Sequence, residues 1–183
     1  MDEYIDIVDK YGKPTGKSEL KSVIHQKGYY HNTAHIWLFT TNGEVLLSQR
    51  SASKSICPLM WDVSVAGHID AGETIEKAAI RETKEEIGLT ITEKELKKIG
   101  VFECFKSYNN TIFDNEFHHT FIAELKTPIS KLKIQKEEVE AIKLVTLDKL
   151  KQLFNTIGNN GNHFVASNKP YYKLVAESIK KHI

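Results

Sequence analysis

The chain has 183 residues, 40% hydrophobic and 27% charged, an ordinary globular composition that excludes disordered and collagen-like classes. Its 25 Lys and Arg residues nearly balance 24 Asp and Glu residues, and the net charge of +1 argues against a dedicated nucleic-acid binder. Two cysteines are too few for a disulfide framework, and neither a signal peptide nor a membrane-spanning apolar stretch is apparent. We therefore expect a single cytoplasmic domain over residues 1–183, with no membrane or nucleic-acid partner.

The first thirty residues predict a strand and a short helix. Apolar and polar residues alternate over 4–9, which is typical of a strand, and Gly12, Pro14 and Gly16 predict a turn after it. Apolar residues at helical spacing over 18–26, with Ser18 as a candidate N-cap, predict a helix that ends near Gly28. These elements form an N-terminal extension, residues 1–30, to the part of the chain that follows.

A β-hairpin is predicted next. Asn42 and Gly43 stand between apolar runs at 35–41 and 44–49, and Asn-Gly between two such runs is a strong hairpin signal. Residues 61–66 alternate again and predict a further strand.

A helix predicted at residues 74–87, ended by Gly88, carries three carboxylates on one face. Glu82, Glu85 and Glu86 stand at i, i+3 and i+4, and each like-charged pair at this spacing costs about 0.2–0.5 kcal/mol in an isolated helix. A divalent cation such as Mg²⁺ or Mn²⁺ would offset that repulsion. Arg81 lies four residues before Glu85 and could hold its carboxylate. On these carboxylates alone, a solvated surface with ion pairs is the competing interpretation.

The rest of the chain predicts alternating strands and helices. Strands at 99–108 and 117–125 flank a polar connection at 109–115, and a strand at 141–145 leads into a helix at 147–157. A Gly- and Asn-rich loop at 158–162 precedes a last helix at 171–181. Strands with interspersed helices, some joined by hairpins, predict a layered α/β fold with a mixed sheet.

Residues 67–89 resemble the Nudix box, Gly-x5-Glu-x7-Arg-Glu-U-x-Glu-Glu-x-Gly-U, in which U is a bulky aliphatic residue. Thr83 replaces the first bulky residue, so we expect it to pack less well against the sheet. The resemblance implies an α/β/α sandwich with the box as a loop–helix–loop. All seven fixed letters are matched, by Gly67, Glu73, Arg81, Glu82, Glu85, Glu86 and Gly88.

The resemblance also implies a metal-dependent hydrolase of small-molecule diphosphates. Mg²⁺ or Mn²⁺ would be held mainly by Glu85 and Glu86, helped by Glu82 and the main-chain carbonyl of Ala66, and would activate an attacking water. Arg81 would orient the carboxylates, and Glu73 would be mainly structural. The general base is open between Glu82 and a carboxylate outside the box, such as Glu116.

Over about residues 1–125 the chain is similar to type I isopentenyl-diphosphate isomerase and its Nudix hydrolase relatives. The similarity lies in the segments 25–31, 35–39 and 61–68. It implies a second metal site, for which His/carboxylate clusters suit several divalent metals; the alternative for His25 is contact with the carbonyls at its own helix end. The positions that match the isomerase's ligands are His25, His31, His68, Asp114 and Glu116.

The isomerase interpretation is disfavoured by Ala66. The isomerase has a cysteine immediately before the box glycine, and the methyl group of Ala66 cannot transfer a proton. We interpret Cys57 as a small buried residue in a loop and Cys104 as a core residue. In the predicted strand, one of His118 and His119 should face the core and the other solvent. A hydrolase is therefore preferred, with an isomerase and a non-catalytic diphosphate-binding module as alternatives.

The residues that select the substrate lie outside the Nudix box. We expect the substrate to be a nucleoside diphosphate or a derivative, because most enzymes of the family that the chain resembles act on such compounds. A prenyl diphosphate would instead need an apolar slot. Stacking on a nucleoside would use aromatic rings, although in strands such rings more often belong to the core. A homodimer stays open. The candidate substrate-binding residues are Trp61, His68 and Tyr108, with Tyr29, Tyr30, Phe105 and Phe113 as further aromatics.

Overall fold

The computed structural model describes residues 2–108, 111–157 and 169–183, so the loop predicted at 158–162 lies outside the described residues. The helices are α1 (Lys21–Lys27), α2 (Ile75–Ile87), α3 (Leu147–Asn155) and α4 (Lys169–Lys180). The strands are β1 (Tyr4–Val8), β2 (Pro14–Leu20), β3 (His31–Phe39), β4 (Glu44–Arg50), β5 (Trp61–Asp62), β6 (Val65–His68), β7 (Lys97–Tyr108), β8 (Ile112–Glu124) and β9 (Val139–Thr146).

The strands form one mixed sheet with β3 at its centre. β3 pairs in parallel with β8 over its whole length, from His31 opposite Glu116 to Phe39 opposite Glu124. It also pairs antiparallel with β6, where Thr33 lies opposite His68. β7 pairs with β8, and β9 pairs with β4. The central strand thus aligns residues from three distant parts of the sequence, which determines where the functional site can form.

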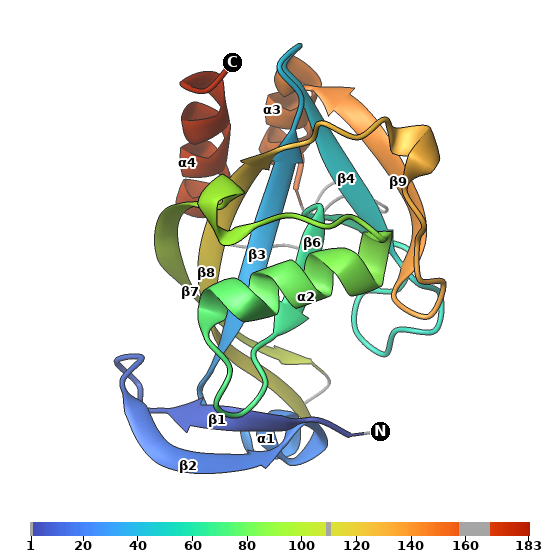
Figure 1. Ribbon diagram of the computed structural model, residues 1–183. Coiled ribbons are helices and arrows are strands. Elements are labelled where there is room, and N and C mark those ends of the chain that lie inside the picture. The colour runs from blue at the N-terminus through green and yellow to red at the C-terminus, as the bar shows by residue number, and fades with distance from the viewer. Residues whose placement is uncertain (1, 109–110, 158–168) are drawn as a thin grey trace.

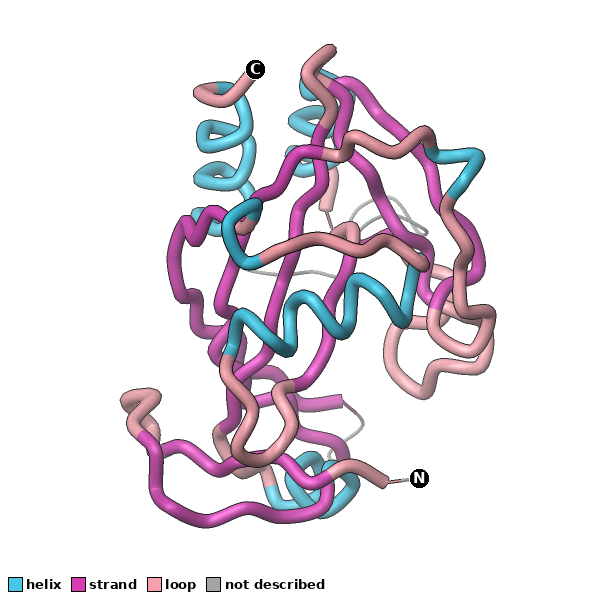
Figure 2. The backbone as a smooth tube through the Cα atoms, in the orientation of Figure 1, coloured by secondary structure: helices cyan, strands magenta, loops and turns pink. Residues whose placement is uncertain are grey.

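The sheet is covered on both faces, as the predicted α/β/α sandwich requires. On β3, Ile36 and Leu38 pack with α2, whereas Trp37 and Phe39 pack with α3 and α4. Because successive side chains of a strand point to opposite faces, this alternation gives the molecule two apolar layers. Figure 1 shows α2 crossing one face of the sheet, and Figure 2 shows the same helices around the strands in cyan.

Two locally encoded predictions are confirmed. β3 and β4 form the hairpin around Asn42 and Gly43. α2 begins after Thr74, whose side chain accepts a hydrogen bond from the Lys77 N–H, and ends at Gly88 in the left-handed conformation, with φ 68°. Thr83 packs better than expected: it is fully buried, and its hydroxyl donates to the Ala79 carbonyl at 2.7 Å.

The helix predicted to start at Ser18 is wrong at its N-terminus. Ser18 lies in β2, where its hydroxyl donates to Asp6 on β1, and α1 starts only at Lys21. β2 is largely exposed and has no apolar alternation, so backbone pairing with β1 outweighs the local helical spacing. The predicted end is confirmed, since Gly28 caps α1.

The strand predicted at residues 61–66 is split in two. β5 pairs with β4 and β6 pairs with β3, and Ser64 lies at the crossing. Its hydroxyl donates to the Leu46 carbonyl and accepts from the Leu38 N–H, at 2.6 and 2.8 Å. Because the pairing partner changes from β4 to β3, Ala66, Gly67 and His68 lie beside the central strand β3.

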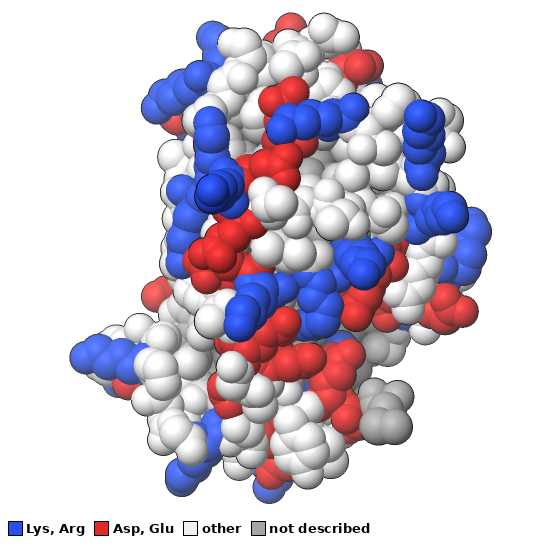
Figure 3. All heavy atoms as spheres, in the orientation of Figure 1, with Lys and Arg blue, Asp and Glu red and all other residues white. Residues whose placement is uncertain are grey.

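The predicted polar connection at 109–115 is too long, because β8 already begins at Ile112 and so includes Asp114 and Asn115. Within the part of the chain that the structure describes, no helix is long and apolar enough to cross a membrane. On the surface that carries α2, acidic and basic side chains are interspersed, in keeping with the near-zero net charge (Figure 3).

Candidate active site and metal centre

A cavity of about 510 Å³ lies beside α2 and receives residues from most of the sheet. The three glutamates of α2 line it, together with Ala66, Gly67 and His68 of β6. We call Glu82, Glu85 and Glu86 the box carboxylates. Glu86 is buried at 7% exposure, whereas the Glu85 side chain is about half exposed at the cavity mouth. The structure therefore favours a site over the solvated surface that these carboxylates alone could have formed.

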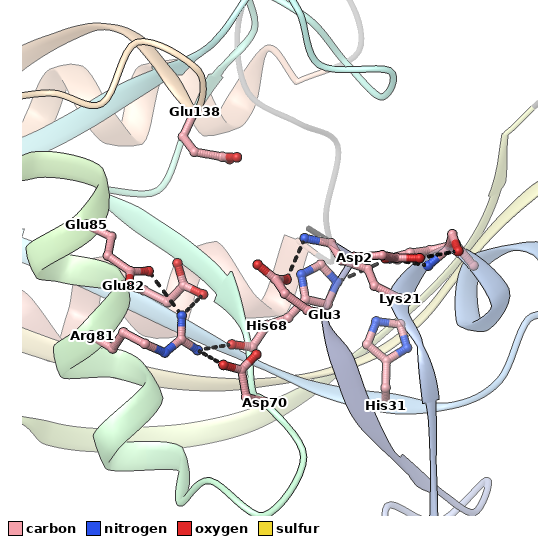
Figure 4. Close-up of polar contacts among 12 residues, drawn as sticks. Asp2, Glu3, Lys21, His31, His68, Asp70, Arg81, Glu82, Glu85 and Glu138 are labelled. Carbon is pink, nitrogen blue, oxygen red and sulfur yellow. Dashed lines mark hydrogen bonds and ion pairs between the residues drawn. The ribbon is translucent and has the colours of Figure 1, made fainter.

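Arg81 ties the box carboxylates to the loop before α2. Its Nη1 donates to Glu82 and Glu85 at 2.8 and 3.2 Å, the latter being the contact expected from the i, i+4 spacing. Its Nε and Nη2 form a two-pronged contact with Glu73, and Nη2 also donates to the His68 carbonyl at 3.0 Å. Figure 4 shows the guanidinium lying between Glu82 and Glu85 on one side and His68 on the other. A planar fork can hold several carboxylates in fixed positions in this way.

Burial disfavours the charge on the two inner carboxylates. Burial raises the pKa of Glu82, although Arg81 pulls it down. Burial and then the charge of Glu82 raise the pKa of Glu86 to about 8, with Lys54 acting in the opposite direction. A carboxylate that is costly to ionise in a closed site suits a bound cation, because the cation would supply the missing positive charge.

Gly67 provides the space that Glu82 occupies. A Cβ at Gly67 would overlap the Glu82 carboxyl group, so this backbone can be approached so closely only at a glycine. We expect Gly67→Ala to push Glu82 away from Arg81 and to lower metal-dependent hydrolysis about 10- to 100-fold. Steady-state kinetics with a circular-dichroism check of the fold would measure this.

The matched control for that substitution is Gly72→Ala, in the turn before α2. A Cβ there would meet nothing within 4 Å, but the residue has φ +77°. Gly72→Ala should therefore cost about 1 kcal/mol of stability through backbone strain and leave the hydrolysis rate unchanged. Equal activity in wild type and Gly67→Ala would contradict the role given to Gly67.

The structure brings together a second group, which we call the histidine cluster: His25, His31, His68 and Glu116. One ligand atom from each lies within 4.8 Å of all the others. The Nε2 atoms of His25 and His68 are 3.2 Å apart, and Glu116 Oε1 is 3.5 Å from His31 Nε2. His31 and Glu116 are partners in the β3–β8 register, and α1 packs against β8 to add His25.

The outer contacts of the histidine cluster fit a metal site. His31 Nδ1 lies 3.1 Å from the Tyr29 carbonyl, and His25 Nδ1 lies 2.9 Å from Asp114 Oδ1. Partners of this kind hold the proton on Nδ1 and leave Nε2 free for a metal. His31 Nε2 is buried and has no hydrogen-bond partner among the described residues. The alternative for His25 is wrong, because its ring contacts β8 and not the carbonyls of α1.

The protonation states of His68 and Glu116 also favour the binding of a cation at the histidine cluster. Burial and then the charge of Lys21 hold the pKa of His68 well below its usual value, so the ring is neutral at pH 7, the form that binds metals. Burial opposes ionisation of Glu116, but the hydrogen bond with His118 and the neighbouring His31 ring hold its pKa well below the usual value. The cluster therefore offers a neutral imidazole at His68 and an ionised carboxylate at Glu116.

Behind Glu116 lies His118, which is buried at 4% exposure as the alternation of β8 predicted, while His119 lies on the other face and contacts Asn32. Cys104 was interpreted as core, and this is wrong: it is half-buried and lines the cavity next to His118, because β7 is an edge strand whose inner face meets the cavity. Burial lowers the pKa of His118, but contacts with Cys104 and Glu116 raise it to about 9.

Three basic side chains that the sequence did not mark as candidates also line the cavity. Lys21 contacts Glu3 at 3.1 Å, Arg50 contacts Asp62 at 3.4 Å, and Lys54 forms an ion pair with Glu138. Figure 4 shows Glu138 across from Glu85 and shows Lys21 near His68. No motif marks these residues, since they come from the start of α1, the end of β4 and the loop that follows β4.

Only two of the three candidate substrate-binding residues line the cavity. Tyr108 and His68 line the cavity. Trp61 does not: it packs against the apolar layer beneath α3 and α4, and Lys143 Nζ lies 3.6 Å from its ring centre. β5 pairs with the edge of β4, which turns this side chain away from the cavity. Cys57 lies in the loop before Trp61, as expected, but it is half-buried and not buried as predicted. The cavity lining also leaves out Tyr29, Tyr30, Phe105 and Phe113.

The chain is similar to known proteins of one family. A family model described as the NUDIX domain matches residues 29–165. An uncharacterised Nudix hydrolase of Clostridium acetobutylicum is 37% identical over 153 residues, covering 81% of this chain and 72% of that protein. An isopentenyl-diphosphate Delta-isomerase of Photorhabdus laumondii is 37% identical over 156 residues, covering 85% and 84%. Nudix hydrolase 3 of Arabidopsis thaliana is 35% identical over 159 residues, and the matched part spans 20% of that longer protein.

Solved structures support the fold. A Deinococcus radiodurans protein superposes with a TM-score of 0.68 at 20% identity, covering 98% of both chains. An Ap4A hydrolase of C. elegans superposes with a TM-score of 0.55 at 21% identity, covering 82% of this chain and 98% of that one.

Proposed function

This chain belongs to the Nudix family, and from that premise we propose that it hydrolyses a diphosphate linkage in a small molecule, using Mg²⁺ or Mn²⁺. The observation that carries the proposal is that the box carboxylates line the same cavity as Lys21, Arg50 and Lys54. Carboxylate oxygens suit a hard divalent cation, and ammonium and guanidinium groups suit phosphates. A nucleoside diphosphate or a derivative is the substrate that we propose.

Each residue has a role in this proposal. Glu85 and Glu86 hold the cation, helped by Glu82 and the Ala66 carbonyl, and Arg81 fixes the positions of Glu82 and Glu85. When bound, the cation neutralises phosphate charge and acidifies the attacking water. Either Glu82 or Glu116 takes up the proton of that water. Tyr108 and His68 contact the substrate from the cavity wall.

The histidine cluster holds a second metal in this proposal. Its ligands are His25, His31, His68 and Glu116, while Asp114 orients His25 through the contact at 2.9 Å. Imidazole nitrogens allow Mn²⁺, Fe²⁺ or Zn²⁺ there, whereas the all-oxygen box carboxylates favour Mg²⁺ or Mn²⁺.

Isopentenyl-diphosphate isomerisation is the second candidate, because the histidine cluster comprises positions implied by the resemblance to that enzyme. The chemistry needs an acid and a base on opposite sides of the double bond. Ala66 offers no proton, and Cys104 is the direct cross-strand partner of Glu116, so thiol and carboxylate project from the same face of the sheet. We therefore place the isomerase second.

A phosphate-release screen tests the proposal. The protein is incubated with Mg²⁺ and panels of nucleotides, sugar nucleotides, coenzymes and prenyl diphosphates, with coupled phosphatase where the product is a phosphomonoester. We expect metal-dependent release that EDTA abolishes, strongest with nucleoside diphosphates or their derivatives. Silence across the panel would favour a non-catalytic binding module, and formation of dimethylallyl diphosphate from isopentenyl diphosphate would favour the isomerase.

A further inference from the structure

The two oxygens of Glu116 face different neighbours. Oε1 lies 3.5 Å from His31 Nε2 and 3.9 Å from His68 Nε2, within the histidine cluster. Oε2 lies 2.9 Å from His118 Nε2, on the side away from the cluster. A carboxylate held at one oxygen presents the other in a fixed direction, so His118 determines where Oε1 points.

His118 is itself held by a buried stack. Its ring lies on that of His35, with centres 3.9 Å apart and planes tilted by 24°. His35 Nδ1 is 2.9 Å from the Tyr171 hydroxyl, which also accepts a hydrogen bond from Trp37 Nε1 at 2.7 Å. His35, Trp37 and Tyr171 are each at most 8% exposed. The His118 ring is therefore held in place by His35 of β3, which is itself held by Tyr171 of α4.

We propose that His118 is a positioning residue for the histidine cluster: it holds Glu116 so that Oε1 meets the three imidazoles, and Tyr171 supports it through His35. The inference rests on the proposed function in that it takes the cluster as a metal site. Tyr171 lies beyond residues 29–165, so this support comes from outside the part of the chain that the family model matches. Loss of such an outer partner typically weakens metal affinity 10- to 100-fold.

The affinity of the protein for Zn²⁺ tests the inference. Zn²⁺ prefers imidazole ligands, so it should bind the histidine cluster more tightly than the all-oxygen box carboxylates. The dissociation constant is measured on metal-free protein by competition with a chromophoric chelator. We expect His118→Phe, which keeps a ring in the stack but has no donor, to weaken Zn²⁺ binding about 10- to 100-fold. His118→Gln, whose amide can donate, should recover most of the affinity. Tyr171→Phe, which removes one hydroxyl, should give a smaller loss.

The matched control is His119→Phe, on the opposite face of β8, where Zn²⁺ affinity should be unchanged. Equal affinity in wild type and folded His118→Phe would overturn the inference, as would an equal loss in His119→Phe. If His118→Phe does not fold, Tyr171→Phe decides: unchanged Zn²⁺ affinity in that variant overturns the inference.

The inference and the proposed function can fail separately. Weaker Zn²⁺ binding in His118→Phe with no hydrolysis by wild type would reject the hydrolase and keep the inference. An active wild-type hydrolase that binds no Zn²⁺ at the histidine cluster would reject the inference and leave the role of the box carboxylates intact.

Discussion

Glu86→Gln is expected to lower metal-dependent hydrolysis at least ~100-fold without destabilising the metal-free protein. Glutamine keeps the volume of the buried side chain but cannot supply a charged ligand. In the folded protein the pKa of Glu86 is about 8, against an ordinary value of 4.5, so the folded chain keeps a proton that the unfolded chain has lost between these pH values. The free energy of unfolding of wild type therefore falls, relative to Glu86→Gln, as pH rises through this window.

Two measurements check this expectation: hydrolysis rates at saturating Mg²⁺, and denaturant unfolding in EDTA at pH 6 and pH 8.5. The control is Glu76→Gln, in the first turn of the same helix but away from the cavity, which should match wild type in hydrolysis and in the change of stability between the two pH values. Wild-type turnover by Glu86→Gln would remove the box carboxylate from the mechanism. A variant less stable than wild type at pH 8.5 would contradict the cost assigned to its charge.

Arg81→Met is expected to lower the free energy of unfolding by about 2–3 kcal/mol and to reduce hydrolysis strongly. The guanidinium satisfies Glu73, Glu82, Glu85 and the His68 carbonyl at once, and the Glu73 and Glu82 side chains are only 17% and 14% exposed. Removing one partner of a buried ion pair costs about 3–5 kcal/mol, and the 25% exposure of Arg81 reduces that figure.

Arg81→Lys should fall between Arg81→Met and wild type, because one ammonium group cannot make the two-pronged contact with Glu73 while holding Glu82. Lys84→Met, an exposed position on α2, is the matched control and should change stability by no more than about 0.5 kcal/mol. Urea unfolding of all four proteins is the measurement. Equal stability of Arg81→Met and Lys84→Met would show that the carboxylates do not depend on Arg81.

Patterns set by neighbouring residues were predictable from the sequence. The spacing of the glutamates on α2, its end at Gly88 and the hairpin at Asn42 and Gly43 depend on contacts within a few residues. β2 was not predictable in this way, because its seven residues are mostly polar and exposed and take their conformation from pairing with β1.

The cavity was predictable only in part. His25, His31, His68 and Glu116 could be named from the family resemblance, but their convergence depends on the β3–β8 and β3–β6 registers. Trp61 and Cys104 were assigned to the wrong surroundings, since burial depends on which side of the sheet each short strand turns. Lys21, Arg50 and Lys54 have no signal in the linear sequence and meet only in the folded chain.

The parallel pairing of β3 with β8 limits how such a chain can change. The same register that sets Glu116 beside His31 sets Phe121 beside Ile36 in the apolar layer under α2. A slip of β8 by one residue against β3 would turn both side chains to the opposite face, so the position of Glu116 and the packing of the core would be lost together. Length variation should therefore be tolerated in the connections between strands, while the packing that keeps the protein folded restrains changes in the position of the proposed metal ligand Glu116.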